Sequence, residues 1–372
     1  MSWAQAEFHD LELGDARRTQ RLIKLVDDLS ARPTGSIPQA CGGWAETKAA
    51  YRLLDNPAVE WREILEVHTT RTVARMAGQP VVLCLQDTTE LDFTTQPGIA
   101  GLGRLSYEAQ HGLYVHPTLA VTPAGVALGV LDAWLWARKP KDQPDVKESL
   151  RWVEGYEIVA DLAETVPDTR LVYVADREGD LRALIDAAAR RGTPADWLIR
   201  SQHNRKTTTG EKLWDRLAQG EPLGEVEFIL PAAPDRPARR VRQTLYRQAV
   251  TLPAHHGQPA VTVTAILARE EQPPTGQPAL VWRLLTNRPA DTLEDVVQLV
   301  DWYRKRWLIE IFFRIWKVGC RVEALQLGTL ERLERALVIY LAIAWRTLHL
   351  VTWGRDCPNL PCDVVFDPEE WQ

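Results

Sequence analysis

The stretch VVLCLQD at residues 81–87 decides how the rest of the chain is interpreted. Its first five residues are all apolar, which is typical of a strand buried on both faces of a sheet. Asp87 follows this run, so rigid backbone would hold its carboxylate at a strand end that faces a ligand crevice. A second apolar run, at 171–175, ends one residue before Asp176. Either aspartate alone could simply cap a turn or a helix, but two such strand ends crowd like charges unless a cation bridges them.

The residues before this stretch indicate a small helical domain at 1–75. Apolar residues recur at helical spacing between 22 and 29, after Asp15, which we expect to cap the helix. A second helix is predicted at 44–54 and a third at 59–76, with no strand signal between them.

The residues after it indicate a mixed sheet with helices packed on it. Strands are predicted at 113–122 and 125–136, followed by a helix at 145–164, a strand at 171–175, a helix at 180–190 and a strand at 196–200. Residues 207–287 alternate in period two between prolines and glycines, which favours an antiparallel β insertion. Helical patterning resumes at Thr292 and continues past Lys317, and a further helix is predicted at 330–350, before a tail at 353–372.

Composition excludes several classes of protein. Hydrophobic residues make up 45% and charged residues 25%, as in an ordinary soluble protein. No run of eighteen apolar residues predicts a membrane span, and the start does not resemble a secretory signal. Five scattered cysteines without a CxxC pair suit a reducing cytoplasm and argue against a disulfide framework or a structural zinc site.

The net charge of −6 speaks against a nucleic-acid partner, but local patches matter more than the sum. Each basic cluster could also be an ordinary solvated face. The clusters are Arg17, Arg18 and Arg21; Arg200, Arg205 and Lys206; and Arg304, Lys305 and Arg306.

A third carboxylate, Glu310, lies in a segment with a distinctive spacing. Arg306, Glu310 and Lys317 follow Tyr303 at offsets of 3, 7 and 14. At about 100° per residue, these four side chains would share an arc of roughly 60° on one helix face. Such a face could be an exposed, salt-bridged surface, since Arg306 and Glu310 form an ordinary i,i+4 pair. It could equally line a phosphate site.

Three carboxylates from two strands and a helix suit two divalent cations, which prefer oxygen ligands. In a two-metal site, one ion activates the attacking oxygen and the other stabilises the leaving oxygen of a phosphodiester. Arg306 and Lys317 would then position the scissile strand through its phosphates. The sequence contains no P-loop, GxGxxG or GxSxG motif and no His/Cys metal-ligand spacing, so the usual rival chemistries are excluded.

Several motifs of the chain resemble those of a known family. The spacing of Tyr303, Arg306, Glu310 and Lys317 matches the Y-(2)-R-(3)-E-(6)-K signature of bacterial insertion-sequence-four transposases, which include the transposon-five enzyme. Similar motifs occur at 13–22, 50–57, 86–89 and 176–178. The resemblance runs from about residue 3 to residue 350.

The resemblance implies a fold and a reaction. The fold would be a ribonuclease-H-like α/β domain at 76–352, with its β insertion at 207–287 before the Glu310 helix, preceded by a helical DNA-end-binding domain at 1–75. The reaction would be cut-and-paste transposition, in which water nicks the transposon end, the freed 3′-OH forms a hairpin, and the end is then joined to target DNA.

The resemblance also implies roles for particular residues. Asp87, Asp176 and Glu310 would be catalytic and bind two Mg²⁺ or Mn²⁺ ions. Phosphate contacts are expected from Tyr303, Arg306, Lys317, Arg205 and Lys206, a flipped-base contact from Trp282, and end recognition from Arg17, Arg18 and Arg21.

The implied partners are terminal inverted repeats and target DNA, bound by a homodimer in the bacterial cytoplasm at the nucleoid, without a membrane. The chain stops soon after its last predicted helix, before most of the region that pairs subunits in the transposon-five enzyme. A catalytically idle or decayed DNA-binding regulator is therefore the alternative, and a stand-alone nuclease on the same fold is a third possibility.

Overall fold

The structure is a computed structural model that describes residues 1–140, 142–232 and 237–366. The chain forms two compact units. Unit 1 comprises Met1–Arg151 and the chain from Trp307 onward, and unit 2 comprises Trp152–Arg306. The boundaries of the two units therefore differ from those of the predicted domains at 1–75 and 76–352.

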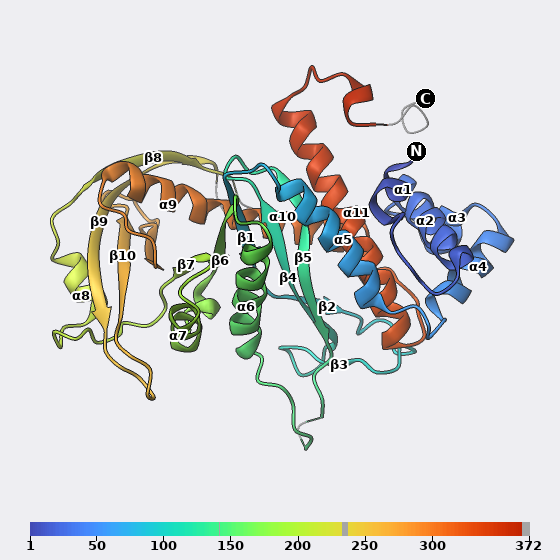
Figure 1. The fold of residues 1–372 in the computed structure, drawn as a ribbon, viewed down its shortest axis with the longest axis horizontal. Coiled ribbons are helices and arrows are strands. Elements are labelled where there is room, and N and C mark those ends of the chain that lie inside the picture. The colour runs from blue at the N-terminus through green and yellow to red at the C-terminus, as the bar shows by residue number, and fades with distance from the viewer. Residues whose placement is uncertain (141, 233–236, 367–372) are drawn as a thin grey trace. The chain divides into compact units, whose positions relative to one another are not determined.

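The N-terminal residues form the helices predicted from the sequence. Asp15 caps the second helix by accepting a hydrogen bond from the backbone N–H of Arg17 at 2.9 Å. The helix predicted at 44–54 is present with those bounds. The five helices, drawn in blue in Figure 1, are α1 (Trp3–Phe8), α2 (Ala16–Ala31), α3 (Ile37–Cys41), α4 (Trp44–Leu54) and α5 (Trp61–Met76).

The strands of unit 1 are arranged around β4 (His111–Val121). β5 (Ala127–Trp136) covers one edge of β4 along almost its whole length. The other edge pairs first with β1 (Val81–Gln86) and then with β2 (Thr89–Asp92), all antiparallel. Two successive strands thus share one edge of β4, and the gap between them falls at Asp87. β2 and the two-residue β3 (Gly103–Arg104) were not predicted from the sequence.

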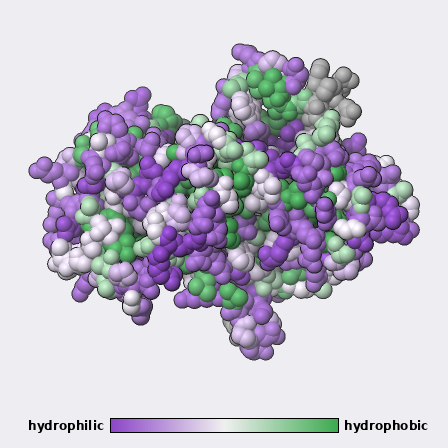
Figure 2. Space-filling view, viewed as in Figure 1, coloured by the Kyte–Doolittle hydropathy of each residue, from purple (hydrophilic) through white to green (hydrophobic). Residues whose placement is uncertain are grey.

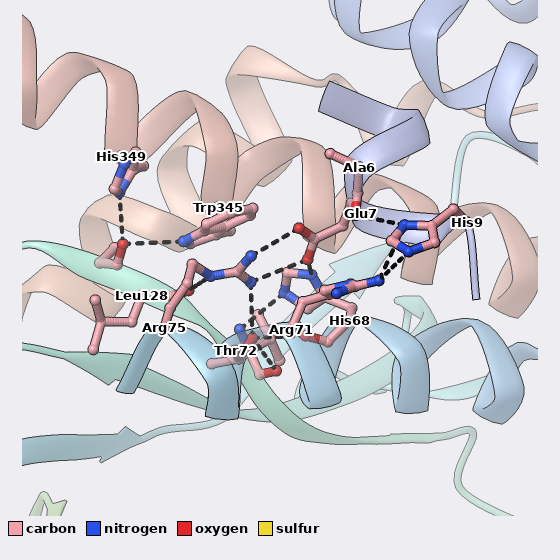
Figure 3. Close-up of polar contacts among 12 residues, drawn as sticks. Ala6, Glu7, His9, His68, Arg71, Thr72, Arg75, Leu128, Trp345 and His349 are labelled. Carbon is pink, nitrogen blue, oxygen red and sulfur yellow. Dashed lines mark hydrogen bonds and ion pairs between the residues drawn. The ribbon is translucent and has the colours of Figure 1, made fainter. Parts of the chain in front are cut away.

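A buried polar network fastens the N-terminal helices to β5 (Figure 3). Glu7 of α1 accepts hydrogen bonds from His68 at 2.6 Å and from Arg75 at 2.8 and 3.0 Å, both on α5. The Nε2 atom of His68 accepts from the backbone N–H of Val130 at 3.0 Å, so Nδ1 carries the proton donated to Glu7. The N-terminal helices and the first strands therefore share one core, which explains why the compact units do not divide near residue 75.

The last long helix, α11 (Leu330–Asp356), completes that core. By length and composition α11 could cross a membrane, but 67% of its apolar window is buried within the protein, as in a core helix. Trp345 and His349 both donate hydrogen bonds to the carbonyl of Ala127, at 3.0 and 2.9 Å. Figure 1 shows α11 beside α5 over β5.

Unit 2 begins with alternating helices and strands, as predicted. β6 (Arg170–Ala175) pairs in parallel with β7 (Asp196–Arg200). The predicted β insertion is confirmed, because β11, β10, β9 and β8 continue from β7 as antiparallel neighbours. The helices are α6 (Leu150–Thr165), α7 (Arg182–Arg190), α8 (Leu213–Ala218) and α9 (Leu293–Lys305), and the insertion strands are β8 (Gly224–Leu230), β9 (Arg239–Leu252), β10 (Val261–Arg269) and β11 (Val281–Thr286). Helix α8 was not predicted.

The predicted continuous helix from Thr292 past Lys317 is wrong. Thr292 caps α9, but α9 ends at Lys305, with Arg306 at its C-cap. A second helix, α10 (Trp307–Arg314), follows and passes into a π-helical segment, Ile315–Gly319. A π-helical turn holds more residues than an α-helical turn, so each of its residues turns the helix by less than 100°. The predicted alignment of Lys317 on one helix face with Tyr303, Arg306 and Glu310 therefore does not apply.

Figure 2 shows hydrophilic side chains over most of the face in view, with hydrophobic ones in separate small patches. Among the described residues, the exposed aromatic side chains include Trp44 at 80%, Tyr107 at 74% and Trp307 at 57% exposure.

Candidate functional site

Asp87 lies at the end of β1, where buried neighbours fix the backbone. Its carboxylate is half-buried and accepts a hydrogen bond from the backbone N–H of Thr88 at 2.8 Å. Just before it, the fully buried Gln86 donates to the Thr118 hydroxyl of β4 at 3.0 Å. The Thr88 hydroxyl lies 2.7 Å from Nδ1 of His116, also on β4. Burial lowers the pKa of His116 to about 3, so this histidine is neutral and positions the strand end without adding charge.

Asp176 lies at the end of β6 in unit 2 and starts a tight turn. Its carboxylate accepts from the backbone N–H of Glu178 at 2.7 Å and caps the 3-10 turn Arg177–Gly179. A Cβ at Gly179 would lie only 2.6 Å from the Ala175 side chain, so the turn requires glycine there. The half-buried carboxylate is thus held close against the strand.

Tyr303 of α9 lies near Asp176, in a corner of unit 2 that also holds two arginines. Burial raises the pKa of Tyr303, the charges of Arg306 and Arg200 oppose that shift, and the charge of Asp176 adds to it. Arg200 is the last residue of β7, and its charge helps to keep the pKa of Tyr303 from rising further. The structure therefore brings Tyr303 and Arg306 together with one predicted catalytic carboxylate, and it adds Arg200, which the sequence offered only as part of a basic cluster.

Glu310 and Lys317 belong to unit 1. Glu310 lies half-buried in the first turn of α10. The ammonium group of Lys317 donates to the carbonyl of Glu90 in β2 at 2.7 Å and pairs with Glu323 at 3.3 Å. Glu323 in turn accepts from the backbone N–H of Asp92 at 2.9 Å. Lys317 is therefore anchored to the strand that begins two residues after Asp87.

The predicted metal ligands are distributed over both units. Asp87 and Glu310 belong to unit 1 and Asp176 belongs to unit 2. Within residues 1–140, 142–232 and 237–366, no three His, Cys, Asp or Glu side chains are grouped so as to hold a metal ion. The donor chemistry suits Mg²⁺ or Mn²⁺, since all three groups are half-buried carboxylates and the hard cations prefer oxygen.

Trp282 of β11 is part of an aromatic stack. Its ring lies parallel to Phe228 at 5.6 Å and meets Tyr303 edge-on at 5.8 Å. The guanidinium of Arg304 lies 4.1 Å from the Phe228 ring centre. Trp282 is half-buried and already packed within the unit, so its predicted contact with a flipped base stays a prediction.

The two basic residues of the predicted DNA-contacting loop differ in their surroundings. Arg205 donates to the carboxylate of Asp180 at 2.5 Å and to its carbonyl at 2.6 Å. Asp180 is almost fully buried and also accepts from the backbone N–H groups of Gln202 and His203. Arg205 therefore stabilises the loop, while Lys206 is exposed. Asp180 was not among the predicted site residues, although it lies only four residues after Asp176.

The arginines predicted to recognise transposon ends lie on α2. Arg18 donates to the carbonyl of Leu13 at 2.9 Å, and Arg17 pairs with Asp15 at 3.0 Å. Arg17 and Arg21 are exposed and line a groove of about 460 Å³ between α2, α3 and α4. Trp44 is the most exposed aromatic residue of α4. The helical surface thus offers both cations and an aromatic side chain to a partner.

Two family models match parts of the chain. A family model described as transposase DNA-binding matches residues 1–59, and one described as transposase DDE domain matches residues 155–346. Among solved structures, the chain is similar to the piggyBac transposase in a cryo-EM synaptic complex with hairpin DNA. That similarity has a TM-score of 0.42 at 10% identity and covers 96% of this chain and 67% of that chain.

The predicted site residues other than Asp87 fall within the two matched ranges. The first range includes Arg17, Arg18 and Arg21, and Asp87 lies outside both. The second range includes Asp176, Arg205, Lys206, Trp282, Tyr303, Arg306, Glu310 and Lys317. The expected α/β fold of the ribonuclease-H-like class, with an N-terminal helical region, is confirmed by the DDE domain match. Since that match covers more than half of its residues, the chain belongs to the family of transposases with a DDE domain, which are enzymes, and it carries a transposase DNA-binding region at its N-terminus.

Proposed function

We propose that this chain is a cut-and-paste transposase of the insertion-sequence-four type, which cleaves DNA at transposon ends and joins those ends to target DNA. The DDE domain match over residues 155–346 carries this proposal. Asp87 and Asp176 at strand ends, and Glu310 in the first turn of α10, would be the acidic triad. The corner formed by Asp176, Tyr303 and the neighbouring arginines supports it, because it combines a carboxylate with cations suited to a phosphate.

The three carboxylates would hold one or two Mg²⁺ or Mn²⁺ ions, which would activate an attacking oxygen and stabilise a leaving oxygen. Arg306 and Lys317 would hold phosphates of the strand to be cut. In the first step, a water oxygen attacks phosphorus, the bond to the 3′ oxygen breaks, and that oxygen takes a proton to become a 3′-OH. In the second step, the 3′-OH attacks a phosphodiester of the other strand or of target DNA, so one bond forms as another breaks.

The test compares wild type with Glu310→Ala on DNA carrying the element's own ends, in the presence of Mg²⁺ or Mn²⁺. Loss of the carboxylate should lower the cleavage rate on the order of a thousandfold, since the metal supplies several kcal/mol of transition-state stabilisation. Binding to the same ends should change little. Glu294→Ala, which removes an exposed carboxylate from α9, is the matched control and should cleave normally.

Unchanged cleavage by Glu310→Ala would contradict the triad. End binding by wild type without any nicking in Mn²⁺ would instead favour a DNA-binding regulator. Cleavage that is independent of the end sequence and is not followed by joining would favour a stand-alone nuclease.

A further inference from the structure

Arg283 of β11 is a half-buried cation with an aromatic neighbour and no acidic partner. Its guanidinium lies 4.5 Å from the ring centre of Trp214 on α8. Across residues 1–140, 142–232 and 237–366, its side chain forms no ion pair or hydrogen bond with another residue. An aromatic face attracts a cation but does not offer the paired oxygen acceptors that match a guanidinium. The N–H donors of Arg283 therefore remain for an external acceptor.

The nearest charges around Arg283 are also positive. Burial lowers the pKa of Arg283, and the charges of Arg200 and Arg269 lower it further. Arg269 has its own counter-charge, since its Nε lies 2.9 Å from a carboxylate oxygen of Glu271. A half-buried cation beside other cations is costly to maintain unless an anion compensates it. This pattern favours binding of an anion from outside the chain.

Hydrogen bonds fix the position of the Trp214 ring that the Arg283 guanidinium contacts. Its indole N–H donates to the Ser201 hydroxyl at 3.2 Å, and its backbone N–H donates to the Asn204 side chain at 2.9 Å. The backbone N–H of Ser201 donates to the carbonyl of Arg283 at 2.6 Å. The pair is thus built on the first residues of the loop after β7, the loop that also carries the exposed Lys206.

Arg283 does not share a face of the sheet with Arg200, which belongs to the corner that contains Asp176. Arg200 is opposite Leu284 in the β7–β11 register, so Arg200 and Arg283 point to opposite faces of the sheet. The charge of Arg200 acts on Tyr303 near Asp176, while Arg283 contacts Trp214. Cationic side chains therefore lie on both faces of the sheet near the end of β7: Arg200 on the face of the carboxylate corner and Arg283 on the face of Trp214.

We propose that Arg283, seated on Trp214, binds a backbone phosphate of DNA. This inference rests on the proposed function, because it assumes that DNA is the polyanion that reaches this surface. The contact would position the strand without reading its sequence, as phosphate contacts do.

The experiment measures binding of the full chain to a labelled duplex between about 50 and 200 mM salt. Each phosphate contact in duplex DNA contributes about 0.9 to the slope of log K against log salt, so Arg283→Gln should lower that slope by about 0.9 and weaken binding several-fold. Arg283→Lys keeps the charge and should keep most of the slope, while Trp214→Leu should weaken binding without removing the charge. The control is Arg240→Gln, which removes an exposed arginine of β9 that is paired with Glu227 of β8 and should bind as wild type does.

Thermal unfolding of each variant separates a DNA contact from a structural role. A wild-type slope in Arg283→Gln would overturn the inference, and a lowered melting temperature with that unchanged slope would show that the pair serves only stability. Failure of the wild-type chain to bind DNA would overturn the proposed function and the inference together. Wild-type binding combined with a normal Arg283→Gln slope would overturn the inference alone.

Discussion

Arg75 of unit 1 and Arg283 of unit 2 are both half-buried, but the surroundings of their positive charges are opposite. In unit 1, Arg75 donates two hydrogen bonds to the buried carboxylate of Glu7, so the charge is neutralised inside the protein. In unit 2, Arg283 contacts a tryptophan ring, and its electrostatic neighbours are other arginines. The first arrangement stabilises the fold and leaves no capacity for a ligand. The second is a poor way to stabilise a fold, and it is what a protein that binds a polyanion needs.

The largest expected effect comes from breaking the closed network. Glu7→Ala would leave Arg75 and His68 without their shared acceptor and should lower the free energy of unfolding by about 3–5 kcal/mol. Urea unfolding of the full chain measures this change. Glu12→Ala, which removes an exposed carboxylate nearby, should change it by less than about 0.5 kcal/mol. Equal effects of the two variants would show that the Glu7 network does not fasten the N-terminal helices.

The same network predicts an acid-sensitive stability. Burial by itself would raise the pKa of Glu7, but the hydrogen bonds from His68 and Arg75 and the charge of Arg75 prevail and lower it from 4.5 to about 2. The folded pKa is lower than the unfolded value, so the stabilisation is complete above pH 4.5 and is lost as the pH falls toward 2. This loss amounts to about 3 kcal/mol. Urea unfolding at several pH values should show it in wild type and not in Glu7→Gln. A variant that retains the full acid dependence would assign it to other groups.

The smallest expected effect separates two adjacent basic residues in unit 2. Arg205 is committed to Asp180, whereas Lys206 is exposed. Arg205→Gln should therefore lower the melting temperature by a few degrees, since it leaves a buried carboxylate without its charged partner. Lys206→Gln should leave the melting temperature unchanged and weaken duplex binding a few-fold, with a smaller salt dependence. The reverse result would mean that Arg205, and not Lys206, contacts DNA.

Much of the fold could be predicted because its signals are local. The apolar run before Asp87, the capping residue Asp15 and the period-two alternation of the insertion each act over a few residues, and each appears as expected. The short strand β2 escaped prediction because its half-buried residues carry little hydrophobic pattern. The break at Arg306 escaped because a helical period continues across it in the sequence.

The candidate site shows the same contrast. The sequence alone singled out Asp176 and Tyr303 as candidates, since a strand end and a residue spacing are visible in one dimension. Arg205, Lys206 and Arg283 are all basic residues in the sequence. Only the tertiary structure distinguished the surroundings of their side chains. The partner of a charged side chain is chosen by long-range packing. The carboxylate of Asp180, which stabilises Arg205, and the indole of Trp214, which holds Arg283, come from elements whose approach no local pattern encodes. The sequence therefore determined which charges the chain carries, and the fold decided which of them remain available to DNA.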